Sequence, residues 1–154
     1  MGEFFVMSMR FNKCCASDFD LIARGENEAY NPLDGSTWRK TELYDFGWGN
    51  ENGFYRLPLL GFDKLFDLVL NSKNEEDRYG AAAMILKVYG DKLLEKCEML
   101  ISDSKRSAEF CKVAKVFQLQ YPFNRGSIDK KTYDQVQNDY ERWKKIAEKA
   151  KLCL

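Results

Sequence analysis

The stretch NEEDRYGAAAMILKVYG, residues 74 to 90, joins an acidic start to a glycine, three alanines and a run of large apolar side chains. Asn74 is a good N-cap, and carboxylates in the first turn are favoured by the positive end of the helix dipole. From Tyr79 to Tyr89 the only charge is Lys87, so a helix here is apolar nearly all round and must be covered on more than one side. The stretch therefore predicts a central packed helix and not an active-site helix.

Gly80 needs a reason, because glycine in a helix interior is less stable than alanine by about 1 kcal/mol. That loss is most easily offset if Gly80 and the alanines at 81 to 83 let another helix approach closely. Gly90 supplies the C-terminal stop. We expect this helix to be the most buried in the protein.

Helical spacing continues on both sides of this stretch. Before residue 57, turn signals dominate, and turns are predicted at Asn31-Pro32, Asp34-Gly35, Gly47, Gly49 and Asn52-Gly53. The segment 4–15 alternates enough to permit a strand, but it has no obvious partner. The prediction is a mainly α single domain over residues 1–154, a compact stack of about five helices from residue 57 onward. Residues 1–56 form an irregular or partly β N-terminal segment. The expected helices cover residues 58–71, 74–89, 91–101, 104–120 and a last one from a Ser127 cap to about residue 150.

An acidic-then-arginine start, a small-residue patch and a leucine-rich partner follow one another in this part of the chain. They are carried by Asp77, Arg78, Ala81, Ala82, Leu86, Leu93 and Leu94. Residues 74–102 thus resemble a HEAT-type helical repeat pair. The resemblance implies a stacked antiparallel helical core and no particular function. No second copy follows at a period of about 40 residues, so a long solenoid is not expected.

The charge of the 154-residue chain is zero overall but unevenly spread. Residues 1–80 hold 9 Lys and Arg against 14 Asp and Glu, and residues 81–154 hold 15 against 10. Such an asymmetry suits an acidic face for a basic partner or a basic face for nucleic acid, though a fold can also place the halves side by side.

Five cysteines, an odd number without CxxC spacing, suggest neither a disulfide framework nor a zinc site. We expect Cys14, Cys15, Cys97, Cys111 and Cys153 to be free buried thiols. No stretch approaches about 18 uninterrupted apolar residues and the start lacks the features of a signal peptide, so a cytosolic location and no membrane association are expected.

Histidine is entirely absent, which removes the commonest general base and the commonest metal ligand together. Dinucleotide, P-loop and zincin motifs are also missing. The carboxylates at 75 to 77 are helix neighbours that point in different directions, unlike the i,i+3 or i,i+4 spacing of a metal site. We therefore expect no enzymatic activity, no cofactor and no metal.

The long aromatic and acidic segment around residues 44–56 fits a binding surface for another protein, because Tyr, Trp and Arg are enriched at interface hot spots. Its candidate partner-binding residues, which would suit a basic protein surface, are Tyr44, Asp45, Trp48, Glu51, Phe54, Tyr55 and Arg56. The alternative is that these rings only fill the helical core. The predicted function is non-catalytic protein binding, as in an inhibitor or immunity-type protein that masks a basic effector by contact.

A second hypothesis is a nucleic-acid-associated regulator that uses the basic C-terminal helix. Its cations are Lys130, Lys131, Arg142, Lys144, Lys145, Lys149 and Lys151, beside the aromatic residues Tyr133, Tyr140 and Trp143. Carboxylates are interleaved with these cations, and the rings fall on the apolar stripe. A solvated helix face explains the same pattern, so nucleic acid is the less favoured partner.

Overall fold

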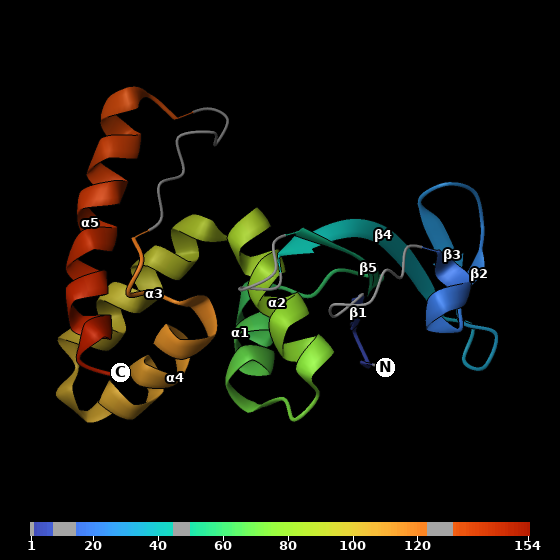
Figure 1. Cartoon of the computed structure of the whole chain (residues 1–154), viewed down its shortest axis with the longest axis horizontal. Helices are drawn as coiled ribbons and strands as arrows, with labels where there is room; N and C mark the ends of the chain where they lie inside the picture. The colour runs from blue at the N-terminus through green and yellow to red at the C-terminus, as the bar shows by residue number, and fades with distance from the viewer. Residues whose placement is uncertain (1, 8–14, 45–49, 123–130) are drawn as a thin grey trace. The chain divides into compact units, whose positions relative to one another are not determined.

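A computed structural model describes residues 2–7, 15–44, 50–122 and 131–154, apart from the side chains of Tyr44, Asn50 and Glu51 (Figure 1). The chain divides into two compact units, Met1–Tyr89 and Gly90–Leu154. The division lies after Tyr89 and not near residue 57, so the first two α-helices share a unit with the N-terminal segment.

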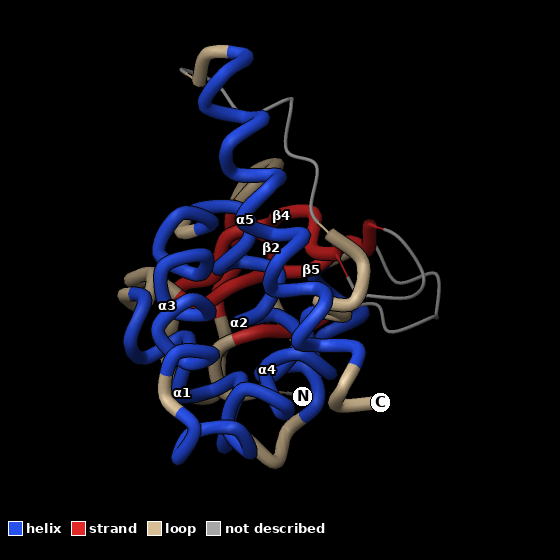
Figure 2. The backbone as a smooth tube through the Cα atoms, turned by 90° about the vertical axis from the view of Figure 1, so that its left-hand side faces the viewer, coloured by secondary structure: helices blue, strands red, loops and turns tan. Residues whose placement is uncertain are grey.

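The first unit is built on an antiparallel sheet, so the prediction of a mainly α, all-helical stack is wrong. Its strands are β1 (Phe5–Met7), β2 (Ile22–Ala23), β3 (Glu28–Tyr30), β4 (Thr37–Tyr44) and β5 (Asn50–Arg56), in the order β1-β5-β4-β3-β2. Every strand of the described residues precedes the first α-helix, and the α-helices follow as a block. Figure 2 distinguishes the strands, in red, from the helices, in blue. The fold is therefore α+β.

One predicted turn of the N-terminal segment is present in the structure, and another predicted turn is part of a strand. The expected turn after Asn31 is confirmed, with Gly35 at φ 74° between β3 and β4. Asn52-Gly53, in contrast, lies inside β5, where Gly53 pairs with Met7 of β1. A Cβ at Gly53 would lie 2.4 Å from the Val6 carbonyl oxygen, so glycine here permits close strand approach and makes no turn.

The two faces of the sheet are both partly buried. On one face, Val6, Trp38 and Phe54 pack with side chains from the 3-10 helix η1 (Ala16–Phe19) and Leu21, and the Phe19 and Phe54 rings meet edge to face at 5.9 Å. On the other face, the helix α2 (Glu75–Val88) packs against β1 and β4, and α1 (Phe62–Asn71) packs against α2.

The helix α2 has more buried residues than any other described helix, as predicted, and Asn74 caps it by accepting the Asp77 amide at 2.9 Å. The neighbour of Gly80 differs from the prediction. A Cβ at Gly80 would lie 2.4 Å from Cγ of Phe5, so the small residue admits a strand side chain and not another helix.

The acidic start of α2 does more than offset the helix dipole. The Asp77 carboxylate, 4% exposed, accepts hydrogen bonds from the amides of Glu3, Phe4 and Phe5 at 2.8 to 2.9 Å. Glu76 accepts from the amide of Met7 at 2.9 Å. Because β1 is an edge strand, its outward amides would otherwise lack partners, and the two carboxylates close that edge.

The second unit is helical. It contains α3 (Gly90–Ser102), the 3-10 helix η2 (Ser104–Arg106), α4 (Ser107–Phe117) and α5 (Tyr133–Lys151). Their apolar stripes meet in a core of Leu93, Leu94, Cys97, Leu100, Phe110, Val113, Ala114, Phe117, Trp143, Ile146, Ala147 and Ala150. The helix α5 begins at a Thr132–Gln135 capping box, whereas the predicted Ser127 cap lies outside the described residues.

Two of the five cysteines are not free thiols. Cys111 and Cys153 form a disulfide with a Cα–Cα distance of 5.4 Å, across 42 residues of sequence. Sequence spacing gave no sign of this pair, because the fold brings the chain end back to α4. Cys97 is a buried thiol as predicted, Cys15 is an exposed one, and Cys14 lies outside the described residues.

Among the described residues, no helix combines the length and the apolar character that crossing a bilayer requires.

Candidate functional site

The helix-side face of the sheet continues beyond α2 as an open surface. Strand pairing places Ile22 opposite Tyr30, Glu28 opposite Arg39, and Arg39 opposite Tyr55. Since alternate residues of a strand share a face, these side chains emerge together. We call this surface the Tyr–Arg face, and it consists of Ile22, Arg24, Glu28, Tyr30, Arg39 and Tyr55.

Contacts within the Tyr–Arg face hold its polar groups in place. The Arg24 guanidinium lies over the Tyr30 ring at 4.2 Å from the centroid. Arg39 approaches the Glu28 carboxylate at 3.5 Å, and its hydrogen bond with the Tyr55 side chain raises the pKa of Arg39 above its usual value. The face therefore presents two arginine–tyrosine pairs, each held by a contact between its own two side chains.

The helix α2 covers only the other end of this face. Phe5 packs under Gly80, and Lys87 donates a 2.7 Å hydrogen bond to the Thr41 hydroxyl. Arg39 and Glu28 keep 48% and 45% of their side-chain surface exposed, and Ile22 is 45% exposed. In Figure 1, β2 and β3 lie at the end of the sheet away from α1 and α2.

The sequence-predicted partner residues are distributed differently. Tyr55 lies half-buried on the Tyr–Arg face, Arg56 lies half-buried on the opposite face, and Phe54 is in the core at 3% exposure. Tyr44 and Glu51 have described backbones, paired with Asn50 and Leu43 respectively, but no described side chains. Asp45 and Trp48 lie outside the described residues.

The residues that the sequence reasoning missed are Arg24, Tyr30 and Arg39. The signal that could have found them is the alternation in TWRKTELY, residues 37–44, which puts Arg39 and Trp38 on opposite faces of a strand. Only the pairing of four strands brings Arg24, Tyr30 and Tyr55 beside it, and pairing is not local in sequence.

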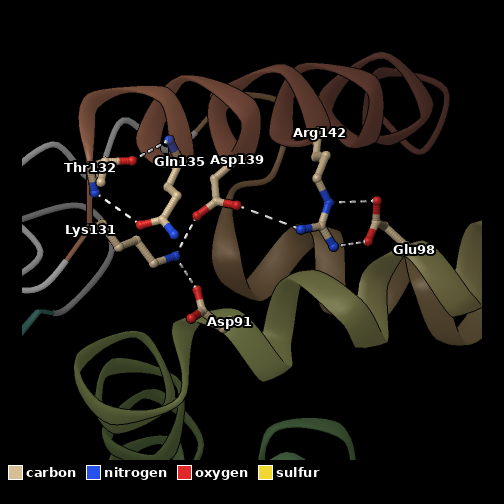
Figure 3. Close-up of polar contacts among 7 residues, drawn as sticks. All are labelled: Asp91, Glu98, Lys131, Thr132, Gln135, Asp139 and Arg142. Atoms are coloured by element: carbon tan, nitrogen blue, oxygen red, sulfur yellow. Dashed lines mark hydrogen bonds and ion pairs between the residues drawn. The ribbon is translucent and has the colours of Figure 1, made fainter.

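A second candidate is a polar cleft of about 500 Å³ in the helical unit. It is lined by Asp91, Glu95, Lys131, Gln135, Asn138, Asp139 and Arg142. Figure 3 shows the polar contacts that Asp91, Lys131, Gln135, Asp139 and Arg142 make with one another and with Glu98 and Thr132. Lys131 pairs with Asp91 at 2.5 Å and also with Asp139. Arg142 forms a two-pronged pair with Glu98 and lies 3.6 Å from Asp139.

These pairs join α5, and Lys131 two residues before it, to α3, so the cleft holds a structural ion-pair network. Burial lowers the pKa of Lys131, but hydrogen bonds to Asp139 and Asp91 outweigh it and the net shift is upward. The hydrogen bond from Arg142 lowers the pKa of Glu98. Both cations are thus already engaged by carboxylates.

Two other cations of α5 are also paired with carboxylates. Lys144 pairs with Glu141 at 3.0 Å and Lys151 with Glu148 at 2.9 Å, each one turn apart. Pairing reduces the positive charge that a phosphate backbone would meet, which disfavours the nucleic-acid hypothesis. The described residues also hold no group of three or more Cys, Asp or Glu arranged to bind a metal ion.

Comparison with known proteins gives no assignment: no family model, no curated protein and no solved structure matches this chain. The resemblance of residues 74–102 to a HEAT-type pair therefore stays a prediction.

Proposed function

We propose that this protein acts by binding another protein without catalysis, and that the Tyr–Arg face is its binding surface. The observation that carries the proposal is a set of two arginine–tyrosine pairs on one side of a sheet, in which the arginines are exposed and the tyrosines are half-buried. Tyr and Arg are among the residues enriched at interface hot spots, since they combine contact area with directional hydrogen bonds. Their mutual contacts reduce the entropy lost when a partner orders them.

The partner presents carboxylates. Among the six residues of the Tyr–Arg face, two guanidinium groups, Arg24 and Arg39, stand against one carboxylate, Glu28, which already pairs with Arg39. Arginine suits a carboxylate because its fork donates two parallel hydrogen bonds. The sequence predicted a partner with a basic surface because of the acidic residues Asp45 and Glu51. Asp45 and the side chain of Glu51 lie outside the described residues, so a basic partner stays a prediction.

An inhibitor or immunity-type role is the form of this function that the sequence predicted. It supposes that binding masks an effector, which needs contact and no reacting group, in keeping with a chain that has no histidine. A cytosolic location also stays a prediction, which fractionation of the source cells can test.

The proposal can be tested by NMR titration with two synthetic peptides, one of alternating Glu and Tyr and one of alternating Lys and Tyr. We expect the Glu–Tyr peptide to shift amides of residues 22–24, 28–30, 38–40 and 54–56. The variant carrying Arg24→Glu and Arg39→Glu should lose these shifts. The control Lys64→Glu, an exposed site on α1, should keep them.

Two outcomes would overturn the proposal. Shifts caused by the Lys–Tyr peptide alone would restore the basic partner. Shifts caused by a single-stranded DNA oligomer on α5, with no response of the sheet to either peptide, would favour the nucleic-acid hypothesis.

A further inference from the structure

The disulfide joins two sites of the helical unit that differ in how firmly they are held. Cys111 lies inside α4, close to the buried Phe110 and Val113, whereas Cys153 comes two residues after the last residue of α5. The last buried residue of α5 is Ala150. Of residues 151–154, Lys151, Leu152 and Leu154 are exposed and Cys153 is half-buried.

Within the part of the chain that the structure describes, the backbone hydrogen bonds of the last residues go to the turn before them. The Leu152 amide donates to Lys149, the Cys153 amide to Ala150 at 2.9 Å, and the Leu154 amide to Lys151 at 3.5 Å. Leu152 and Leu154 are 81% and 78% exposed, so they contribute little apolar contact. The disulfide is thus the bond that fixes this C-terminal turn to α4.

We propose that the Cys111–Cys153 disulfide is a reversible lock on the C-terminal turn, opened by small thiols such as glutathione without unfolding the helical unit. Both cysteines are half-buried, so a thiolate can reach one of the sulfurs. Lys112 follows Cys111 directly in the sequence, and a cation near a sulfur favours a departing thiolate. The buried core of α4 and α5, which includes Val113, Phe117 and Ile146, is made of apolar side chains other than the two bonded cysteines.

Opening of the lock takes two successive thiol–disulfide exchange steps. A glutathione thiolate attacks one sulfur, forms a mixed disulfide with that cysteine and releases the other cysteine as a thiolate, which takes up a proton. A second glutathione thiolate attacks the mixed disulfide, giving glutathione disulfide and the second cysteine thiol. Two electrons pass from two glutathione molecules to the protein disulfide.

Cys97 does not compete in this exchange. It is fully buried, and that burial together with the nearby charge of Glu98 raises the pKa of its thiol to about 12. A thiol that is almost never ionised at neutral pH is a poor nucleophile. The lock therefore involves Cys111 and Cys153 as a closed pair within the described residues of this unit.

The test is a redox titration of the native, full-length protein in glutathione buffers, with trapping by N-ethylmaleimide and peptide mass mapping. Hydrogen exchange is measured on the oxidised and reduced forms. We expect millimolar glutathione to reduce the pair without denaturant. Exchange should then rise by about tenfold or more in residues 148–154, while the peptides of α3 and the Trp143 region stay protected.

The Cys153→Ser variant should reproduce the exchange pattern of the reduced form, and Cys97→Ser should keep the bond and the oxidised pattern. The proposal is overturned if the bond yields to thiols only in denaturant. It is equally overturned if reduction raises exchange throughout α3, α4 and α5, or if Cys153→Ser exchanges like the oxidised protein.

Discussion

Replacing Asp77 should destabilise the first unit far more than replacing any neighbouring acid, because this carboxylate holds the edge strand β1. Its oxygens accept three backbone amides, from Glu3, Phe4 and Phe5, at 2.8 to 2.9 Å. Hydrogen bonds to a charged group contribute about 1.5–3 kcal/mol each, and an orphaned buried donor costs about 1–3 kcal/mol.

The three bonds do not add in full. Only the bond to Phe5 is buried on both sides, and the amides of Glu3 and Phe4 are part-buried, so water can partly replace the lost acceptor. We therefore expect Asp77→Ala to lower the free energy of unfolding by about 3–5 kcal/mol. Asp77→Asn keeps one acceptor oxygen but turns an NH₂ group toward an amide donor, which should cost about 2–3 kcal/mol.

The assay combines urea unfolding with hydrogen exchange at the Phe5 and Met7 amides. The matched control is Glu75→Gln, an exposed first-turn acid whose loss should cost at most about 1 kcal/mol through the helix dipole. The Phe5 amide should exchange at least about 100-fold faster in Asp77→Ala. Equal destabilisation by Asp77→Ala and Glu75→Gln would refute the role given to this carboxylate.

Three further predictions follow from single contacts. Gly80→Ala should destabilise the first unit by about 1–3 kcal/mol, because its Cβ would overlap Phe5 at 2.4 Å, although alanine is the better helix former. Cys97 should resist alkylation at pH 8 in the native protein, since its thiol pKa is raised to about 12. Arg142→Gln should remove at most about 1 kcal/mol of stability at pH 7, since the pair with Glu98 is partly exposed, and less at low pH. The pKa of Glu98 is lowered in the folded state, so its contribution is present above the unfolded pKa and is lost as the pH falls through the folded value.

Each of these three predictions has a control or a result that would contradict it. Gly61→Ala, where a Cβ meets nothing within 4 Å, should be nearly neutral, and a stabilised Gly80→Ala would show that Phe5 gives way easily. Cys15, which is exposed, should be alkylated in the same sample, and equal labelling of Cys97 would contradict its burial. A loss from Arg142→Gln that grows as the pH falls from 7 to 3 would contradict the sign of the Glu98 pKa shift.

Helix positions were predictable because their signals are local. Asn74 caps α2 as predicted, and the burial of α2 follows from its apolar composition. The start of α5 was also within reach, since Thr132 and Gln135 match the S/T-x-x-E/Q capping box, but the sequence reasoning placed the cap at Ser127.

The sheet escaped prediction because its stabilising contacts are distant in sequence. Pairing of Phe5 with Tyr55 spans 50 residues, and nothing near either residue specifies the other. The pair Asn52-Gly53 predicts a turn, but Gly53 lies within β5, where the absence of a Cβ lets the Val6 carbonyl oxygen approach closely. The Tyr–Arg face could not be predicted for the same reason, because its residues come together only when β2 to β5 pair in the observed register.

The most direct test of protein binding through the Tyr–Arg face is photocrosslinking in the source cells, with benzoylphenylalanine in place of Tyr30 or Tyr55. If a protein binds this face, the probe should form a protein adduct at both positions. The partner peptide in each adduct should be rich in Asp and Glu. The adduct should disappear when Arg39→Glu is added, and none should form with the probe at Asp67, an exposed position on α1. The absence of an adduct at both tyrosines, with efficient crosslinking to protein or nucleic acid from the exposed Tyr133 of α5, would contradict it.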